Sequence, residues 1–206
     1  DTHALRRALE HSSVRVQRTA AIALDQLDPR ALKPESAIGW LDHADPDVRQ
    51  SADWLLSRHT EWGGALAETL QRQLQSPLTE EQAAALTQRL QNFVEQPTIS
   101  ALLANILASA ESPKDSRLIA ARVMQKTSVK QTPPDWNTAL AQAVSGTDRD
   151  IAAEAIVAAR ALPALEGDAA GLADALTKAA EDARLTDDVR LDALAALPAG
   201  AALSPA

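Results

Sequence analysis

The sequence predicts an all-α fold, a right-handed α-α superhelix of about six helical hairpins that forms one domain over residues 1–206. A short apolar pattern recurs about every 32 to 38 residues, which is the period of helical repeat arrays. Alanine supplies about a fifth of the residues and aromatics only 2%, a composition that favours closely packed helices over sheets. The long segments show helical spacing of their apolar residues, and none alternates with period two.

The recurring pattern marks the second helix of each hairpin. An aliphatic residue is followed four residues later by Ala or Leu and eight residues later by another apolar residue. The clear copies are Val16/Ala20/Leu24, Val48/Ala52/Leu56, Ile151/Ala155/Ala159 and Val189/Ala193/Leu197, and weaker copies are Arg117/Ala120/Met124 and Gln82/Leu86/Leu90. One hairpin is too small to bury its own apolar stripe, so neighbouring hairpins must stack. We therefore expect Ala52, Ala120, Ala155 and Ala193, which share one position of the repeat, to be buried where paired helices come closest.

The first three hairpins are expected at residues 2–28, 34–60 and 64–95. Pro34 suits the first turn of a helix that carries Ile38 and Leu41. The run Asp45-Pro46-Asp47 predicts the start of the partner helix, because acidic side chains are favourable beside a helix N-terminus. Thr79-Glu80-Glu81-Gln82 predicts a capping box, and Gly63-Gly64 predicts a break between hairpins.

The last three hairpins are expected at residues 97–128, 134–163 and 168–198. Ser112-Pro113-Lys114-Asp115 predicts a helix start of the same kind as Asp45-Pro46-Asp47. Pro133-Pro134 and Gly146 bracket a short helix, and Asp148 begins its partner. The expected breaks lie at residues 131–134 and 163–167.

The net charge of −8 is unevenly distributed along the chain. Residues 1–33 carry six basic and four acidic side chains, residues 34–134 nine and twelve, and residues 135–206 five and twelve. An acidic half repels phosphate, so we expect no nucleic-acid partner. The basic concentration formed by Arg6, Arg7, Arg15 and Arg18 is interpreted as a charged outer face of the first repeat, or as a contact with an acidic partner or a preceding domain.

No set of residues predicts a catalytic, cofactor-binding or metal-binding site. The absence of Cys excludes disulfides, thiolate nucleophiles and haem-attachment motifs. The spacing of His3, His11, His43 and His59 contains no metal-binding pair, so these are expected to be surface or capping residues. Helix capping also accounts for the carboxylate pairs Asp45/Asp47, Asp148/Asp150 and Asp187/Asp188. Nucleophile-elbow and phosphate-binding glycine motifs are absent from the sequence.

The four tryptophans are the remaining candidates for a binding surface. Trp40, Trp54 and Trp62 lie within one repeat and its exit, and Trp136 opens a later first helix. Trp is enriched in binding anchors, so three in one region could form a contact for a partner. Trp54 occupies a position filled by Ile22 and Val157 elsewhere, so we expect it to pack between repeats, and we expect Trp62 to be the most exposed.

The ends of the sequence favour a segment of a longer protein. No run of 18 apolar residues and no basic region followed by an apolar stretch is present, so neither membrane insertion nor a signal peptide is expected. The chain begins at Asp1, and its one Met is Met124. We expect the segment to have been excised from a larger multidomain chain.

The second-helix sequence Asp-x-Asp-Val-Arg-x-x-Ala resembles that of HEAT repeats, which form armadillo-like solenoids. It occurs at Asp45 to Ala52 and is echoed at Asp187 to Ala193. The resemblance covers nearly the whole chain, and it implies ladder residues that link adjacent repeats at the Asp and Arg positions. The matching residues are Asp47, Arg49, Asp188 and Arg190, whereas Gln17 and Ala152 depart from the pattern.

Two further segments resemble the helical middle region of large haem-binding membrane-bound dehydrogenases of the planctomycete group. They are Pro133-Pro134-Asp135-Trp136 and Leu191 to Gly200, the latter followed by Leu203-Ser204-Pro205. In those proteins a HEAT-like stretch lies between a β-propeller and a cytochrome c domain. The resemblance implies a periplasmic or otherwise extracytoplasmic location, and it brings no catalytic residue to this chain.

We therefore expect a non-catalytic helical-repeat scaffold, spacer and docking module within a larger exported haem-binding dehydrogenase-like protein. Its partners would be neighbouring domains of the same chain or another protein, and the oligomeric state is left open. One alternative is a stand-alone HEAT-repeat adaptor that binds a protein or peptide along its concave face. Another is a helical-repeat enzyme acting on nucleic acid, such as the base-removing glycosylases, which the acidic balance disfavours.

Overall fold

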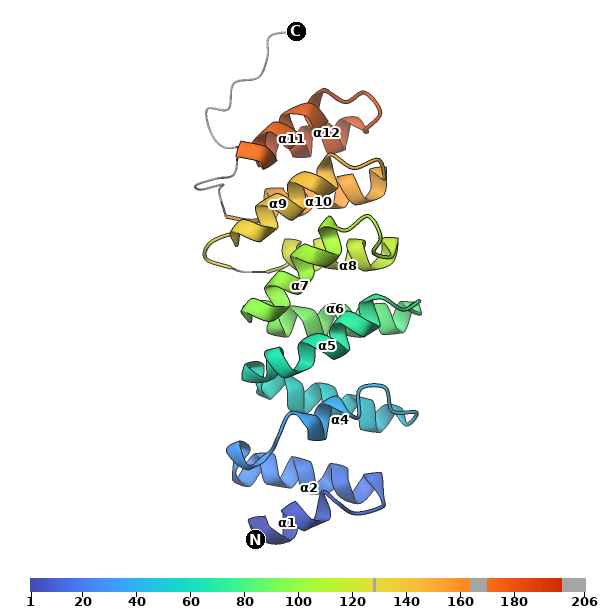
Figure 1. Cartoon of the computed structure of the whole chain (residues 1–206), viewed down its shortest axis with the longest axis vertical. Coiled ribbons are helices and arrows are strands. Elements are labelled where there is room, and N and C mark those ends of the chain that lie inside the picture. Colours follow the sequence, from blue (N-terminus) through green and yellow to red (C-terminus); the bar gives the residue numbers. More distant parts are fainter. Residues whose placement is uncertain (128, 164–169, 198–206) are drawn as a thin grey trace. The chain divides into compact units, whose positions relative to one another are not determined.

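A computed structural model describes residues 1–127, 129–163 and 170–197 of the chain. The described part contains twelve α-helices and two 3-10 helices, and it contains no strand (Figure 1). The all-α prediction is therefore confirmed. The chain divides into two compact units, residues 1–69 (unit 1) and residues 70–206 (unit 2), and each is described by itself.

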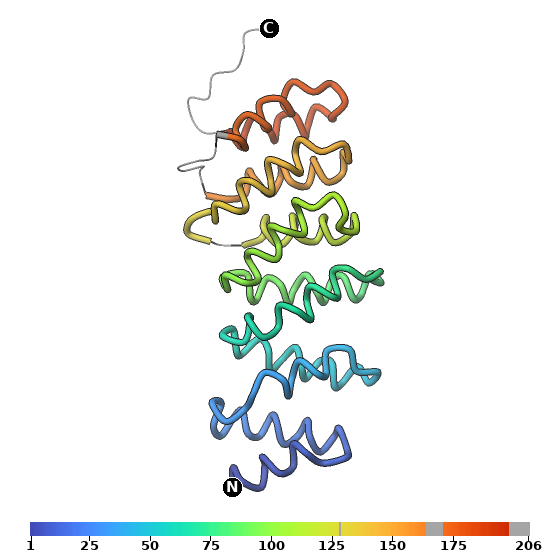
Figure 2. Tube along the Cα trace, viewed as in Figure 1, coloured from blue at the N-terminus to red at the C-terminus, as the bar shows by residue number. Residues whose placement is uncertain are grey.

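Unit 1 is a short series of helices connected by tight turns (Figure 2). Its elements are α1 (Thr2–Ala8), α2 (Val14–Leu27), η1 (Pro29–Ala31), α3 (Glu35–Ile38), α4 (Pro46–Arg58) and η2 (Thr60–Trp62). Helix α2 is central, because it packs against α1 on one side and α4 on the other. Helix α3 packs against α4. The first two predicted hairpins are thus present, with their second helices side by side.

Helix α3 is shorter than the sequence pattern predicts. The helix expected to carry Ile38 and Leu41 ends at Ile38, and Gly39 follows it. After Gly39 the backbone hydrogen bonds join residues three positions apart, as in a 3-10 helix. The Trp40 amide donates to the Ala37 carbonyl, and the Leu41 amide donates to the Ile38 carbonyl. Glycine has a low helix propensity, so a helix of one turn is not extended through it.

Unit 2 contains the longer and more regular series of helices. After α5 (Gly63–Leu74), which spans the division between the units, these are α6 (Glu80–Phe93), α7 (Pro97–Ala108), α8 (Lys114–Gln125), α9 (Pro134–Val144), α10 (Arg149–Ala161), α11 (Ala170–Glu181) and α12 (Asp187–Ala196). Helix α9 packs against both α7 and α11, and α10 packs against both α8 and α12. Helix α6 packs against α8. The first helices therefore form one layer and the second helices another (Figure 1).

Helix starts follow the predicted capping residues at most positions. The Asp45 side chain accepts the Asp47 amide, and the Asp148 side chain accepts the amides of Asp150 and Ile151. Thr79 and Gln82 form the predicted capping box. Helix α8 differs, because Pro113 occupies its N-cap position and provides no side-chain cap.

The small residues of the repeat lie where the sequence predicts them. Ala52, Ala120, Ala155 and Ala193 are each 0% exposed, which confirms their shared buried position. Val16, at the start of the first copy of the pattern, is 37% exposed and so lies outside the core. The expected break at residues 164–167, the expected hairpin ends at residues 128, 168–169 and 198, and the segment Leu203-Ser204-Pro205 lie outside the described residues.

Candidate functional site

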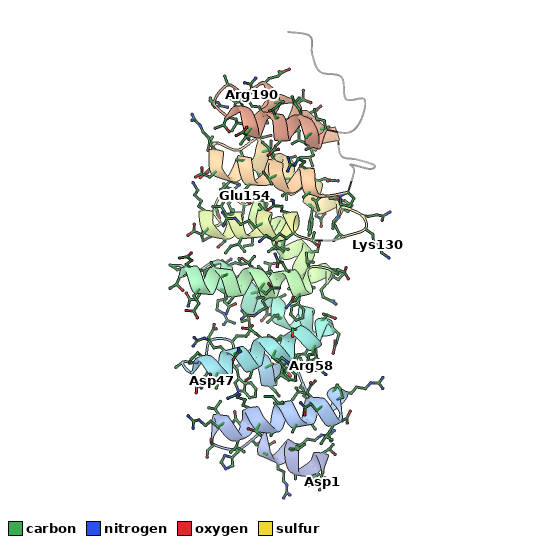
Figure 3. The ribbon with its side chains drawn as sticks, turned by 180° about the vertical axis from the view of Figure 1, so that it is seen from behind. Asp1, Asp47, Arg58, Lys130, Glu154 and Arg190 are labelled. Carbon is green, nitrogen blue, oxygen red and sulfur yellow. The ribbon has the colours of Figure 1, made fainter. Side chains whose placement is uncertain are left out.

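The most extensive buried polar cluster of unit 1 centres on Asp25. This residue lies on the face of α2 that packs against α4, and its side chain is only 1% exposed. Its two carboxylate oxygens accept from different residues at the end of α4: Oδ2 from Arg58 Nε at 2.7 Å, and Oδ1 from His59 Nε2 at 2.6 Å. Figure 3 labels Arg58 on α4. A buried carboxylate requires partners of this kind, because its desolvation would otherwise destabilise the fold.

His59 occupies the C-cap position of α4 and is 5% exposed. Its second ring nitrogen, Nδ1, lies 2.8 Å from Glu61 Oε1. Its ring stacks on Trp62 with centroids 3.9 Å apart and an angle of 4° between the planes. The sequence predicts a surface or capping histidine here, and the structure shows the capping alternative, with the side chain buried.

Both ring nitrogens of His59 face carboxylate oxygens, which are acceptors when ionised. Both ring nitrogens of His59 therefore have a carboxylate partner, Asp25 on one side and Glu61 on the other. Burial would raise the pKa of Glu61, but the His59 hydrogen bond and a bond from its own backbone outweigh this and lower it. The cluster joins α2 to the end of α4 through the Asp25 carboxylate.

Two other histidines organise the turns that precede second helices. His11 Nδ1 accepts the Ser13 amide at 2.9 Å, and His43 Nδ1 accepts the Asp45 amide at 3.0 Å. In each turn, the side chain six residues after the histidine donates back to the histidine carbonyl. Gln17 does so to His11 at 2.6 Å, and Arg49 does so to His43 at 2.8 Å. Gln17 therefore makes in the first hairpin the same bond that Arg49 makes in the second, although Gln at this position departs from the HEAT-like sequence pattern.

The repeated arginine makes contacts within its own hairpin. Arg117 Nε donates to the Leu107 carbonyl at 3.0 Å, and Arg190 Nε donates to the Ala180 carbonyl at 2.9 Å. Both acceptors belong to the last turn of the preceding first helix, where backbone carbonyls need partners. Arg190 also bonds Asp187, three residues earlier on the same helix. The expectation that Arg49 and Arg190 link adjacent repeats is therefore wrong, because the hydrogen bonds of both side chains stay within one hairpin.

Other residues connect the second helices of unit 2, and we call them the ion-pair ladder. Lys114 on α8 contacts Asp148 at 3.1 Å and Asp150 at 2.5 Å, at the start of α10. The hydrogen bond to Asp150, and after it the bond to Asp148, raises the pKa of Lys114. The bond from Lys114 in turn lowers the pKa of Asp148.

The ladder continues along the same layer of helices. Arg122 Nε of α8 lies 3.4 Å from Glu154 Oε2 of α10, and Arg160 of α10 pairs with Asp192 of α12. Figure 3 shows Glu154 between α8 and α10. Each pair is partly exposed and so contributes little stability alone, but each joins two neighbouring second helices.

The tryptophans reverse the predicted order of exposure. Trp62 is 7% exposed because it stacks on His59, so the expectation that it is the most exposed is wrong. Trp54, expected to pack between repeats, is 39% exposed, and the Arg58 guanidinium lies 5.0 Å from its ring centroid. Trp40 is buried, and Trp136 is 0% exposed and donates from Nε1 to the Ser100 carbonyl of α7 at 3.1 Å.

The predicted basic concentration lies on two packed helices of unit 1. Arg6 and Arg7 are exposed in the last turn of α1, and Arg15 and Arg18 lie in the first turns of α2. Because α1 packs against α2, the four residues belong to one hairpin. Their role as a contact for an acidic partner stays a prediction.

A crevice of about 340 Å³ opens in unit 2 where the turn between α9 and α10 meets the turn between α11 and α12. We call it the turn crevice. It is lined by Val144, Ser145, Gly146, Thr147, Arg149, Ala152, Ala175, Lys178, Ala179, Asp182, Arg184 and Leu185. The sequence does not indicate this crevice, because its residues come from two hairpins and form no continuous motif.

Within this crevice, Arg184 holds Asp182 through both carboxylate oxygens. Arg184 Nε lies 2.9 and 3.0 Å from Oδ1 and Oδ2, and Nη2 lies 2.7 Å from Oδ2. These side-chain bonds lower the pKa of Asp182 to about 2, although burial alone would raise it. Smaller contributions in the same direction come from the Arg184 amide and from the charges of Arg184 and Arg149. Asp182 is thus ionised at neutral pH and neutralises Arg184.

The described residues contain no candidate metal site and no candidate membrane span. No group of three His, Asp or Glu side chains in this part of the chain is arranged to hold a metal ion. Over the same residues, every helix is too short or too polar to cross a bilayer. Comparison with models of known protein families finds no match, and comparison with curated proteins finds none either.

Proposed function

We propose that the chain is a non-catalytic helical-repeat scaffold that docks neighbouring domains or a protein partner. The supporting observation is the two-layer packing of unit 2, in which α7, α9 and α11 form one row and α8, α10 and α12 another. Such packing makes an extended surface from a series of similar hairpins, which is how helical-repeat proteins present binding faces. The polar clusters of both units fit this role, because their hydrogen bonds join helices to each other.

We further propose that the repeats form a right-handed α-α superhelix of the HEAT type. The support is the recurrence of one buried alanine position and of arginines that bond the last turn of the preceding helix. The ion-pair ladder adds a repeated connection between second helices. These features recur from one hairpin to the next, as the helical-repeat resemblance implies.

We propose docking within a larger exported haem-binding dehydrogenase-like protein as the setting, on the sequence resemblance described above. An acidic surface in residues 135–206 would favour a basic neighbouring face, since complementary charge sets the register and speed of association. Attraction of this kind weakens as salt screens the charges.

Cross-linking of carboxylates in the natural full-length protein, followed by mass spectrometry, tests the scaffold role. We expect links from the acidic residues of α10 to α12 to a neighbouring domain or protein, and fewer such links at high salt. Links confined to the helical segment itself would contradict docking.

A gel-shift titration tests the nucleic-acid alternative separately. We expect no micromolar binding to DNA at about 150 mM salt, because phosphate contacts supply most non-specific affinity and this chain is acidic. Tight binding with a steep salt dependence would contradict the proposal.

A further inference from the structure

The turn crevice lies beside a position where the repeat lacks its usual long side chain. In the hairpins α7–α8 and α11–α12, Arg117 and Arg190 occupy this position and bond the last turn of the first helix. In the hairpin α9–α10 the equivalent residue is Ala152, which lines the crevice close to Val144 in the last turn of α9. Ala152 is too short to reach the last turn of α9 as Arg117 and Arg190 reach the last turns of α7 and α11.

The rim of the crevice is positively charged, although residues 135–206 as a whole are acidic. Arg149, Lys178 and Arg184 supply three positive charges, and Asp182 supplies one negative charge. Arg184 and Asp182 neutralise each other through their paired hydrogen bonds. Arg149 and Lys178 are both exposed and both line the crevice, so two cationic side chains border it besides the Arg184–Asp182 pair.

The remaining surfaces of the crevice suit a small ligand. Ala152, Ala175 and Ala179, which are almost fully buried, form the apolar base of the crevice beside Leu185, and Ser145 and Thr147 provide hydroxyl groups. The volume of about 340 Å³ falls at the lower end of the range found for small-molecule sites. The C-terminal ends of α9 and α11 each contribute about half a negative charge, and the two full positive charges at the rim outweigh their sum.

We propose that the turn crevice binds a small organic oxyanion, held by Arg149 and Lys178 with its short apolar body above Ala152. The recognised chemistry is a carboxylate or phosphate group, and the guanidinium and ammonium groups would form charge-assisted hydrogen bonds with it. This site is additional to the proposed docking role and does not depend on it.

Calorimetric titration of the whole chain tests the site with three probes: succinate, inorganic phosphate and succinamide. We expect succinate to bind with a Kd of about 1 mM or below, because two charge-assisted hydrogen bonds contribute at that level. Succinamide, which has the same shape without charge, should not bind. Stronger binding of phosphate than succinate would identify phosphate as the preferred group, and saturable binding of neither anion would overturn the proposal.

Matched variants locate the binding. Lys178→Ala should weaken succinate binding about tenfold, whereas Lys130→Ala, which removes an exposed lysine away from the crevice, should leave it unchanged. An equal effect of the two variants would show a general charge effect and overturn the site.

A second variant fills the crevice without adding charge. Ala152→Gln introduces the residue that Gln17 supplies at this position in the first hairpin, so helical circular dichroism should be retained. Succinate binding should be lost. Parental affinity in this variant would place binding elsewhere and overturn the proposal.

Discussion

Replacing Asp25 with alanine should destabilise the protein clearly, because this one carboxylate bonds two residues at the end of α4. The change removes a carboxylate that is 1% exposed and leaves His59, whose side chain is 6% exposed, without its Nε2 partner. Leaving a buried hydrogen-bonding group without its partner costs about 1 to 3 kcal/mol, and the small cavity left by the carboxylate adds to this. Glu61 still faces Nδ1, and Arg58 is 47% exposed and can be hydrated, so neither adds a further large cost. We expect a loss of about 3 kcal/mol.

Thermal unfolding followed by circular dichroism measures this effect. If the 206 residues unfold together, about 3 kcal/mol corresponds to a fall in melting temperature of about 6 to 12 °C. Arg58→Ala is the matched control and should cost about 1 kcal/mol, since Arg58 is half-exposed and also contacts Trp54, and Asp25 keeps its bond to His59. The double variant Asp25→Leu/His59→Leu should recover much of the loss, because apolar replacement of a buried pair is often neutral. A melting temperature of Asp25→Ala equal to that of the parent would refute this reasoning.

Three further predictions follow from the packing and the charges. Ala52→Phe and Ala193→Phe should each cost about 1 to 3 kcal/mol in urea unfolding, because both alanines are 0% exposed, and parental stability in both would refute the assigned repeat position. Asp182→Asn should lower the melting temperature above about pH 4, and the difference from the parent should close as the pH falls toward 2, since a carboxyl with a lowered pKa stabilises the fold only while it is ionised; a difference that persists at pH 2 would contradict this origin. Trp136→Phe should cost about 2 kcal/mol in urea unfolding, because the buried indole loses volume and its bond to the Ser100 carbonyl, and an unchanged midpoint would argue against that bond.

The features predicted correctly are those that depend on nearby residues. The cap at Asp148 and the capping box at Thr79 involve contacts within three positions, so the sequence alone indicates them. The buried position shared by Ala52 and Ala193 follows from the repeat period. These features identify the helices and their pairing.

The polar clusters could not be predicted in the same way. Asp25 and His59 are 34 residues apart, and no local pattern distinguishes a buried His from a surface one. The exposure of Trp54 and the burial of Trp62 depend on which face of α4 meets α2 and on the stacking with His59. One usable signal was present: Gln17 and Arg49 both follow a histidine by six residues, which indicates that they serve the same turn.

The packing of unit 2 also bears on how the chain folds. Helices α7 to α12 contact helices of their own hairpin or of an adjacent one, so the residues that meet are separated by only a few tens of positions. Folding rates rise as the sequence separation of native contacts falls, because closing short loops costs less entropy. We expect this region to fold rapidly and to begin from any pair of adjacent hairpins. During synthesis, α7 to α10 could thus acquire structure before α12 has left the ribosome.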